Sequence, residues 1–218
     1  MRCKAVLFDL DGTLLDTLGD LADSMNQVLA DKGYPQHRTE DYRYFVGDGM
    51  EMLVSRALPP EARKGDVVAR GLAAMEAEYG RRWSRTTRPY DGVPAMLDEL
   101  QSRQTLMAIL SNKPEDFTRL TVSTLLKSWS FDAVCGARPG VPRKPDPAAA
   151  LEIAARLQVR PPECLYLGDT ATDMKTARRA GMYAVGALWG FREAAELEAG
   201  GAQVLVREPA DFLEICAD

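Results

Sequence analysis

The sequence is poor in the residues that bind soft metals or act as neutral bases. It contains one histidine, His37, and four cysteines, none of which form a Cys-x-x-Cys pair. His37 lies in a polar, turn-rich stretch, and we interpret it as a surface residue. Cys3, Cys135 and Cys164 lie in or beside strand-like runs, which is typical of small buried apolar residues in a reducing compartment. Any catalytic acid, base or metal ligand must therefore be sought among the carboxylates.

Two further absences exclude classes of protein. No apolar run is long enough to span a bilayer, and no charged and apolar leader precedes the first strand-like run, so we expect a soluble, untargeted, cytoplasmic protein. The 27 basic residues are outnumbered by 32 acidic ones, which leaves a net charge of -5 and no basic surface for nucleic acid or anionic membranes. We expect a monomer or homodimer that binds neither nucleic acid nor membrane. The hydrophobic content of 46% suffices for a sizeable core.

An apolar run near the beginning of the sequence ends in two aspartates. Ala5 to Phe8 predicts a short strand buried on both faces, as in a parallel sheet covered by helices. Asp9 and Asp11 follow it, and ligands bind outside the carboxyl ends of strands in open α/β sheets. Gly12 permits a sharp turn, and Thr13 adds a hydroxyl group and an N–H. A simple turn is the alternative, although a turn does not require two carboxylates.

The rest of the sequence divides into a helical part and an alternating part. Helical spacing of apolar residues predicts helices over residues 18–29, 50–58 and 61–79. We interpret residues 17–88 as a small all-helical cap domain inserted after the first strand, which can act as a lid. After Gly92 strands and helices alternate, which predicts a doubly wound parallel α/β sheet formed by residues 1–16 and 89–218.

Polar residues follow the expected strands in the second part. Five further strands are expected at residues 105–110, 131–136, 164–167, 182–188 and 202–206. Ser111 and Asn112 follow the first of these, Lys144 lies in a proline-flanked loop, and Asp169 and Asp173 follow a later strand. In a parallel sheet these groups emerge at one edge, together with the first two aspartates. Taken one at a time, these residues have more common explanations. Ser111, Asn112 and Asp169 could cap helices, and Lys144 could be a solvated surface lysine.

Taken together and in this order, the motifs resemble those of the haloacid dehalogenase superfamily of phosphohydrolases. DLDGT, LSNKP, RKPDP and GDTATD match its four motifs, and the helical insertion is similar to its alpha-helical cap of the first type. A carboxylate set without histidine or paired cysteine suits a hard ion such as Mg²⁺. The resemblance implies that Asp9 and Asp169 bind Mg²⁺ through their side chains and Asp11 through its backbone carbonyl. Asp173 would support the ion from behind these ligands or at the edge of its coordination sphere.

The resemblance also implies catalytic roles. Asp9 would attack phosphorus and become an aspartyl-phosphate. Asp11 would protonate the departing alkoxide and then deprotonate the hydrolytic water. Its presence favours a phosphatase over a dehalogenase, because a halide needs no proton to leave. Lys144 and Mg²⁺ would neutralise the developing charge. The expected phosphoryl-binding groups are Ser111, Thr13 and the N–H groups near Asp11 and Asn112.

Three segments, residues 44–58, 111–114 and 189–193, resemble phosphoglycolate phosphatases. That resemblance implies a small substrate carrying both a phosphate and a carboxylate. The turn formed by Gly47, Asp48 and Gly49 at a helix start offers backbone N–H groups. Asp48 stands where the family often carries Asn. Arg43 and Arg56 are candidate partners of the substrate carboxylate, with surface positions on a helix as the alternative.

Two alternatives to this substrate and activity stay open. A related phosphatase or phosphomutase would act on sugar phosphates, nucleotides or pyrophosphate. A phospho-accepting signalling module also combines clustered carboxylates with Mg²⁺, Ser or Thr, and Lys. Such modules place the accepting aspartate on a later strand and have no helical lid after the first strand, which disfavours this alternative.

Overall fold

The computed structural model describes residues 3–217, which form two compact units. One unit comprises the described residues up to Leu15 and those from Pro89 onward, and the other comprises Asp16–Arg88. The chain passes between them through β2 (Leu15–Asp16) and β3 (Arg88–Pro89), which pair as a short two-stranded sheet. Within the described residues, no helix combines the length and the apolar character that crossing a bilayer requires.

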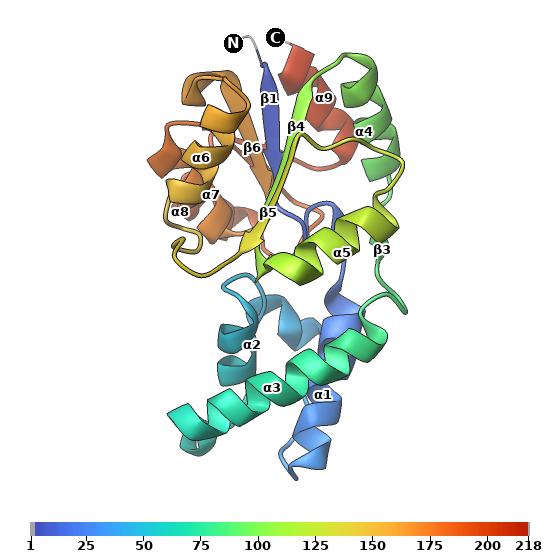
Figure 1. Cartoon of the computed structure of the whole chain (residues 1–218), viewed down its shortest axis with the longest axis vertical. Helices are drawn as coiled ribbons and strands as arrows, with labels where there is room; N and C mark the ends of the chain where they lie inside the picture. Colours follow the sequence, from blue (N-terminus) through green and yellow to red (C-terminus); the bar gives the residue numbers. More distant parts are fainter. Residues whose placement is uncertain (1–2, 218) are drawn as a thin grey trace. The chain divides into compact units, whose positions relative to one another are not determined.

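The first unit is built on a six-stranded sheet. Its strands are β1 (Ala5–Phe8), β4 (Leu106–Pro114), β5 (Ala133–Ala137), β6 (Cys164–Gly168), β7 (Tyr183–Ala187) and β8 (Val204–Val206). They lie in the order β5-β4-β1-β6-β7-β8, and every neighbouring pair is parallel. Figure 1 labels β5, β4, β1 and β6 of this sheet. Since β1 lies between β4 and β6, Phe8 is in register with Ile109 on one side and Leu167 on the other. The predicted parallel α/β sheet is confirmed, and register brings the residues after these strands to one edge.

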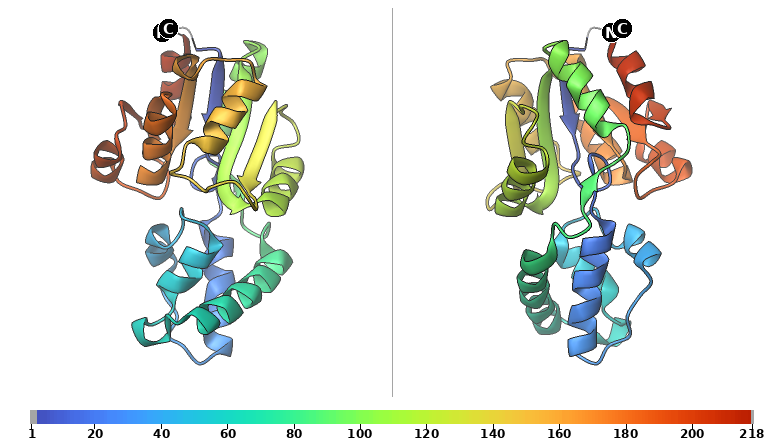
Figure 2. Two further views of the ribbon diagram at one scale, coloured as in Figure 1. Left: turned by 60° about the vertical axis from the view of Figure 1, so that its left-hand side comes forward. Right: turned by 90° about the vertical axis from the view of Figure 1, so that its right-hand side faces the viewer.

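Helices cover both faces of this sheet (Figures 1 and 2). One face carries α4 (Val93–Ser102), α5 (Glu115–Leu125) and α9 (Pro209–Ala217), and the other carries α6 (Ala148–Arg156), α7 (Ala171–Ala180) and α8 (Ala194–Gly200). A short 3-10 helix, η3, spans Pro161–Glu163. Val6 and Phe8 pack into the first layer, whereas Ala5 and Leu7 pack into the second. This alternation explains why β1 reads as a continuous apolar run.

Strand β4 is longer than the sequence pattern predicts. The expected strand ended at residue 110, but β4 continues to Pro114. Its register with β5 shifts between Leu110 and Pro114, and pairing resumes where Pro114 lies opposite Ala137. Ser111 and Asn112 therefore lie within the irregular end of the strand and not after it. Hydrophobic patterning could not predict this extension, because the added residues are three polar ones and a proline.

The second unit is helical. Its elements are α1 (Leu18–Asp31), η1 (Thr39–Tyr44), α2 (Met50–Ala57), η2 (Pro60–Ala62) and α3 (Gly65–Arg82). Leu21, Met25 and Tyr79 are among its buried side chains. The third helix begins at Gly65, later than the predicted residue 61, because residues 60–62 form a separate 3-10 turn and Lys64 is extended.

A buried carboxylate fixes the two ends of the helical unit to each other. Asp20, in the first turn of α1, is 1% exposed. Its oxygens accept hydrogen bonds from the backbone N–H groups of Thr86 and Thr87 at 2.9–3.0 Å and from both hydroxyl groups at 2.8 Å. Four donors of Thr86 and Thr87 therefore bind one carboxylate, which holds the entry and the exit of this unit together.

Candidate active site

Asp9 is the first residue after β1 and lies at the carboxyl end of the sheet. Its N–H donates to the carbonyl oxygen of Leu167 at 2.9 Å, which extends the pairing with β6, and Asp9 is only 6% exposed. Its Oδ1 accepts a hydrogen bond from the N–H of Leu10 at 2.7 Å. Backbone pairing on both sides of β1 thus fixes where this carboxylate lies.

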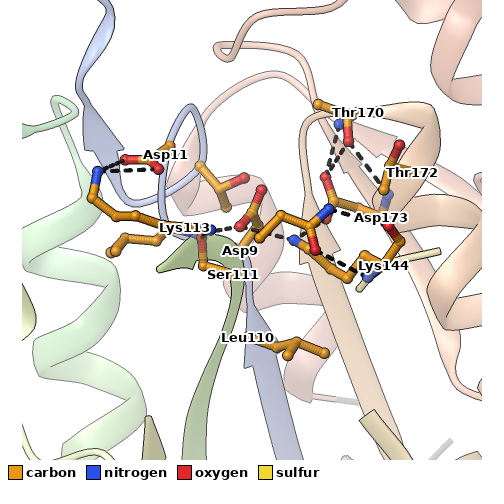
Figure 3. Close-up of polar contacts among 12 residues, drawn as sticks. Asp9, Asp11, Leu110, Ser111, Lys113, Lys144, Thr170, Thr172 and Asp173 are labelled. Atoms are coloured by element: carbon orange, nitrogen blue, oxygen red, sulfur yellow. Dashed lines mark hydrogen bonds and ion pairs between the residues drawn. The ribbon is translucent and has the colours of Figure 1, made fainter. Parts of the chain in front are cut away.

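Lys144 places its ammonium group between two buried carboxylates (Figure 3). Its Nζ lies 2.9 Å from Asp9 Oδ1 and 2.7 Å from Asp173 Oδ1. Asn112 holds the loop: its Oδ1 accepts from the Lys144 N–H at 2.9 Å, and its Nδ2 donates to the Lys144 carbonyl at 3.1 Å. The ammonium also lies 5.9 Å from the centre of the Tyr166 ring. The lysine is therefore held at both its backbone and its charged end.

Asp169, the residue after β6, is fully buried and held through both oxygens. Oδ1 accepts from the Thr13 hydroxyl at 2.9 Å, and Oδ2 accepts from the Phe191 N–H at 2.8 Å. The Thr13 side chain, which we expected to contact phosphate, thus orients a carboxylate in this structure. Gly12 has a φ of +88°, and a Cβ there would lie 2.3 Å from Asp169 Oδ2. Both the conformation and the close approach require glycine.

Asp173 divides its two oxygens between a helix cap and the lysine. Thr170 is the N-cap of α7, and its side chain accepts from the Asp173 N–H at 3.3 Å. Asp173 Oδ2 accepts in return from the Thr170 N–H at 3.1 Å and from its hydroxyl at 2.6 Å, which completes a capping box. Oδ1 is thereby turned toward Lys144. Thr170, and not Asp169, is therefore the residue that caps α7. The Asp169 carboxylate belongs to the site and not to the helix cap.

The three carboxylates form one cluster. Ligand oxygens of Asp9, Asp169 and Asp173 all lie within 4.8 Å of one another. Burial, with the neighbouring Asp173, raises the pKa of Asp169 to about 7, and the same two causes raise the pKa of Asp9 well above its ordinary value. Burial opposes the charged form of Lys144, but Asp173 and Asp9 raise its pKa well above the ordinary value. When all three carboxylates are ionised, their negative charge exceeds the single positive charge of the Lys144 ammonium.

This cluster fits a hard divalent cation. Its donors are carboxylate oxygens, which Mg²⁺ prefers, and no histidine or cysteine belongs to it. Burial and the negative charge of Asp173 raise the pKa values of Asp9 and Asp169, and a divalent ion would favour the ionised forms of both. Asp11 is not one of the three clustered residues. We expect Asp11 to bind the metal through its backbone carbonyl. The position of its side chain is compatible with that expectation.

Asp11 has a partner that the sequence analysis did not assign. Lys113 Nζ lies 3.0 Å from Asp11 Oδ1 and 3.3 Å from Oδ2 (Figure 3). The Lys113 side chain is 2% exposed and that of Asp11 is 13% exposed. Ser111, also buried, accepts a hydrogen bond from the Lys113 N–H at 3.1 Å. A signal existed, since Lys113 comes two residues after Ser111 at the end of the same expected strand.

The loop after β7 completes the surroundings of Asp169. The indole N–H of Trp189 donates to the Thr13 carbonyl at 2.9 Å, and the Phe191 N–H donates to Asp169. Arg192, 8% exposed, contributes to lowering the pKa of Asp169 against the effect of burial. From the sequence, the segment of residues 189–193 is linked to the function only through the family resemblance. Its position after a strand of the same parallel sheet could have indicated that it belongs to the site.

The remaining expected residues belong to the helical unit. Gly47, Asp48 and Gly49 precede α2, and Gly47 and Gly49 have φ values of +120° and +92°. Arg56 Nη2 lies 2.5 Å from Asp48 Oδ2, and its Nη1 donates to the Phe45 carbonyl at 3.1 Å. Arg43 lies in η1 and is half-buried. The structure therefore brings Asp48 and Arg56 together as an ion pair.

Comparison with known proteins identifies relatives over nearly the whole chain. A family model described as haloacid dehalogenase-like hydrolase matches residues 6–187. Phosphoglycolate phosphatase of Pseudomonas putida is 31% identical, over 99% of this chain and 80% of the relative. Phosphoglycolate phosphatase of Xanthomonas campestris pv. campestris is 34% identical, over 98% and 96%. A crystal structure from Lactobacillus delbrueckii subsp. bulgaricus, 30% identical, matches with a TM-score of 0.93 over 99% of each chain.

Proposed function

The chain belongs to the haloacid dehalogenase-like hydrolases, and on this premise we propose that it is a Mg²⁺-dependent phosphatase acting on 2-phosphoglycolate. One observation carries the proposal: Asp9 lies at the carboxyl end of the central strand, beside two other buried carboxylates and the Lys144 ammonium. A carboxylate can attack a phosphate dianion only where cations offset their repulsion. The site supplies one cation and the ligands for another.

Asp9 and Asp169 would hold the ion through their side chains and Asp11 through its backbone carbonyl, with Asp173 behind them. When bound, the ion would withdraw charge from the phosphoryl oxygens and fix their orientation. Lys144 adds the second positive charge from within the protein, and Asp173 keeps its ammonium directed into the site. The structural role of Asp173 is thus to position both cations.

The first chemical step forms a bond between an Asp9 oxygen and phosphorus and breaks the bond from phosphorus to the glycolate oxygen. Asp11 gives a proton to that departing oxygen. Water then hydrolyses the aspartyl-phosphate, and Asp11 takes up a proton from it. Ser111 and the N–H groups near Asp11 and Asn112 would bind the phosphoryl oxygens through both steps. The Asn112 side chain serves a different purpose, because it holds the Lys144 loop.

One observation supports a substrate that also carries a carboxylate, and a second removes an objection to it. Curated relatives that align with nearly all of this chain are phosphoglycolate phosphatases. In the helical unit, Asp48 is paired with Arg56, so the acid that stands in place of the family's frequent Asn does not present an uncompensated negative charge. We propose that Arg43 and Arg56, with the turn from Gly47 to Gly49, form the specificity-determining surface of a cap. The protein is proposed to work in the cytoplasm as a monomer or homodimer.

Steady-state phosphate release from a panel of phosphoesters tests this function. The panel comprises 2-phosphoglycolate, sugar phosphates, nucleotides, pyrophosphate and an aryl phosphate, each with Mg²⁺ or with a chelator. We expect kcat/KM for 2-phosphoglycolate to exceed that of the other alkyl phosphates about tenfold or more, with no turnover in the chelator. A higher kcat/KM for a sugar phosphate or a nucleotide would overturn the substrate assignment but not the phosphatase assignment. A single stoichiometric phosphorylation without sustained release would overturn the phosphatase assignment.

A further inference from the structure

Two cysteines from opposite ends of the sequence meet in the core unit. Cys3 precedes β1, Cys216 lies in the last turn of α9, and their Sγ atoms are 2.9 Å apart. The two residues are separated by 213 positions. Cys135 and Cys164, by contrast, are buried strand residues, as the sequence predicts. Cys3 and Cys216 are only partly buried. They differ from the other two cysteines because they contact each other and because solvent can reach them.

The fold determines this contact. The beginning of β1 and the end of α9 lie at the same end of the core unit (Figure 1). The Phe8 and Phe212 rings pack with centroids 6.2 Å apart, which anchors α9 against the central strand. Cys216 lies four residues after Phe212 and so on the same face of the helix. Both cysteines pack at the edge of the apolar layer that contains these rings.

We propose that Cys3 and Cys216 form a reversible disulfide when the protein meets a peroxide. Nothing in the proposed phosphatase chemistry uses either residue. The pair lies beside the beginning of β1, whereas Asp9 follows its other end. The bond would therefore join the first strand to the last helix without altering the catalytic residues.

The surroundings distinguish the two thiols. The hydrogen bond between the two thiols lowers the pKa of Cys216 despite burial, and the nearby Arg103 acts in the same direction. The same hydrogen bond and burial raise the pKa of Cys3. Arg103 is held at this end of α9, because its Nη1 donates to the Leu213 carbonyl at 3.2 Å. Cys216 is thus the better nucleophile, and Cys3 is positioned to resolve the product.

The chemistry balances with one peroxide. The Cys216 thiolate attacks a peroxide oxygen, the O–O bond breaks, and Cys216 becomes a sulfenic acid while water or an alcohol leaves. The Cys3 sulfur then attacks the Cys216 sulfur and the S–O bond breaks. The hydroxyl group leaves as water with the Cys3 proton as the S–S bond forms. The two sulfurs are each oxidised by one electron and the peroxide is reduced by two. A small dithiol restores both thiols by exchange.

Mass spectrometry of the intact, full-length protein tests the proposal. The reduced protein is treated with one equivalent of hydrogen peroxide, the remaining thiols are alkylated, and the protein is digested without reductant. We expect the loss of two hydrogens and a linked peptide pair containing Cys3 and Cys216. Cys3→Ser and Cys216→Ser should each abolish the link, whereas the matched control Cys135→Ala should retain it. A link from Cys3 to Cys164, a link between two molecules, or sulfinic acid without any link would overturn the proposal.

Thermal unfolding provides a second measurement that does not depend on activity. Closing a loop of this length restricts the unfolded chain, so oxidation should raise the Tm of wild type by roughly 5 to 15 °C. Dithiothreitol should reverse the rise, and neither serine variant should show it. Turnover should be equal in the oxidised and reduced forms. A Tm that is unchanged or lowered by oxidation would show that the native fold does not accommodate the bond.

Discussion

Lys113 Nζ lies 3.0 Å from Asp11 Oδ1, in an ion pair between residues 102 positions apart. The proposed general acid and base is thus held by a cation from β4, a strand that also carries Ser111. The contact fixes where the Asp11 carboxylate lies relative to Asp9. We infer that Lys113 is a positioning residue, which acts on the reaction through Asp11.

Replacing Lys113 with methionine should lower kcat with 2-phosphoglycolate by roughly 10- to 100-fold, because a misplaced acid transfers its proton poorly. KM should change much less. In urea unfolding, a double-mutant cycle of Lys113→Met with Asp11→Asn should give a coupling energy of about 0.5 to 3 kcal/mol. The exposed Lys175 on α7 provides the control variant Lys175→Met. A kcat equal to that of wild type would remove Lys113 from this role.

Asp11→Asn should slow alkyl phosphates far more than aryl phosphates. An alkoxide needs a proton to leave, whereas a nitrophenolate leaves readily without one, so the loss of the acid affects the first class most. Pre-steady-state phosphorylation rates with 2-phosphoglycolate and p-nitrophenyl phosphate check this directly. Equal slowing of both substrates would show that Asp11 is not the acid.

The stability of the protein should depend on pH through Asp169. Burial and Asp173 raise its pKa to about 7, whereas an aspartate in the unfolded chain titrates near ~3.9. The folded protein binds this proton more tightly, so the stabilising contribution is complete below about pH 4 and is lost as pH rises through about 7. Without a divalent ion, the free energy of unfolding should therefore fall between pH 5 and 8, in urea titrations.

Mg²⁺ should reverse this fall at pH 8, because it binds the ionised carboxylates of the folded state only. Asp169→Asn should make the fall shallower, with Asp9 contributing the remainder, and should weaken the response to Mg²⁺. If the free energy of unfolding has the same pH dependence in wild type and Asp169→Asn, the dependence does not come from this carboxylate.

The contribution of Asp20 to stability should depend on pH in the opposite direction. Burial raises its pKa, but the hydrogen bonds from Thr87 and Thr86 outweigh this and hold the pKa below its ordinary value. Its contribution is therefore present above the unfolded value and is lost as pH falls through the lowered folded value. Asp20→Asn should reduce the free energy of unfolding by about 1 to 3 kcal/mol at pH 7 and progressively less in acid. The exposed Asp23→Asn on the same helix is the control, and an equal effect of both substitutions would refute the prediction.

The sheet and its catalytic edge could be predicted from the sequence because they depend on local pattern. Four apolar residues before Asp9 predict a strand covered on both faces, and a parallel sheet then brings the residues after successive strands to one edge. The family resemblance supplied the roles of those residues. The roles and the domain boundaries remain predictions.

The contacts that orient the site could not be predicted in this way. The ion pair of Lys113 with Asp11 depends on side-chain directions at the end of β4, where the register shifts. The hydrogen bond of Thr13 to Asp169 joins the loops after two different strands, so it depends on the tertiary fold. The helices α8 and α9 were not predicted, and with α9 the contact of Cys3 and Cys216 was missed. Their apolar residues are few or lie close to the chain end, so periodicity gives little signal there.

The central claim is that Asp9 becomes phosphorylated during turnover, and rapid-quench trapping tests it most directly. The enzyme is mixed with 2-phosphoglycolate and Mg²⁺, quenched in acid within one turnover, reduced with borohydride, digested and analysed by mass spectrometry. We predict homoserine at position 9, formed and lost at rates that match turnover, and none in Asp9→Asn. Sustained phosphate release with an unmodified Asp9 at every quench time would contradict the account.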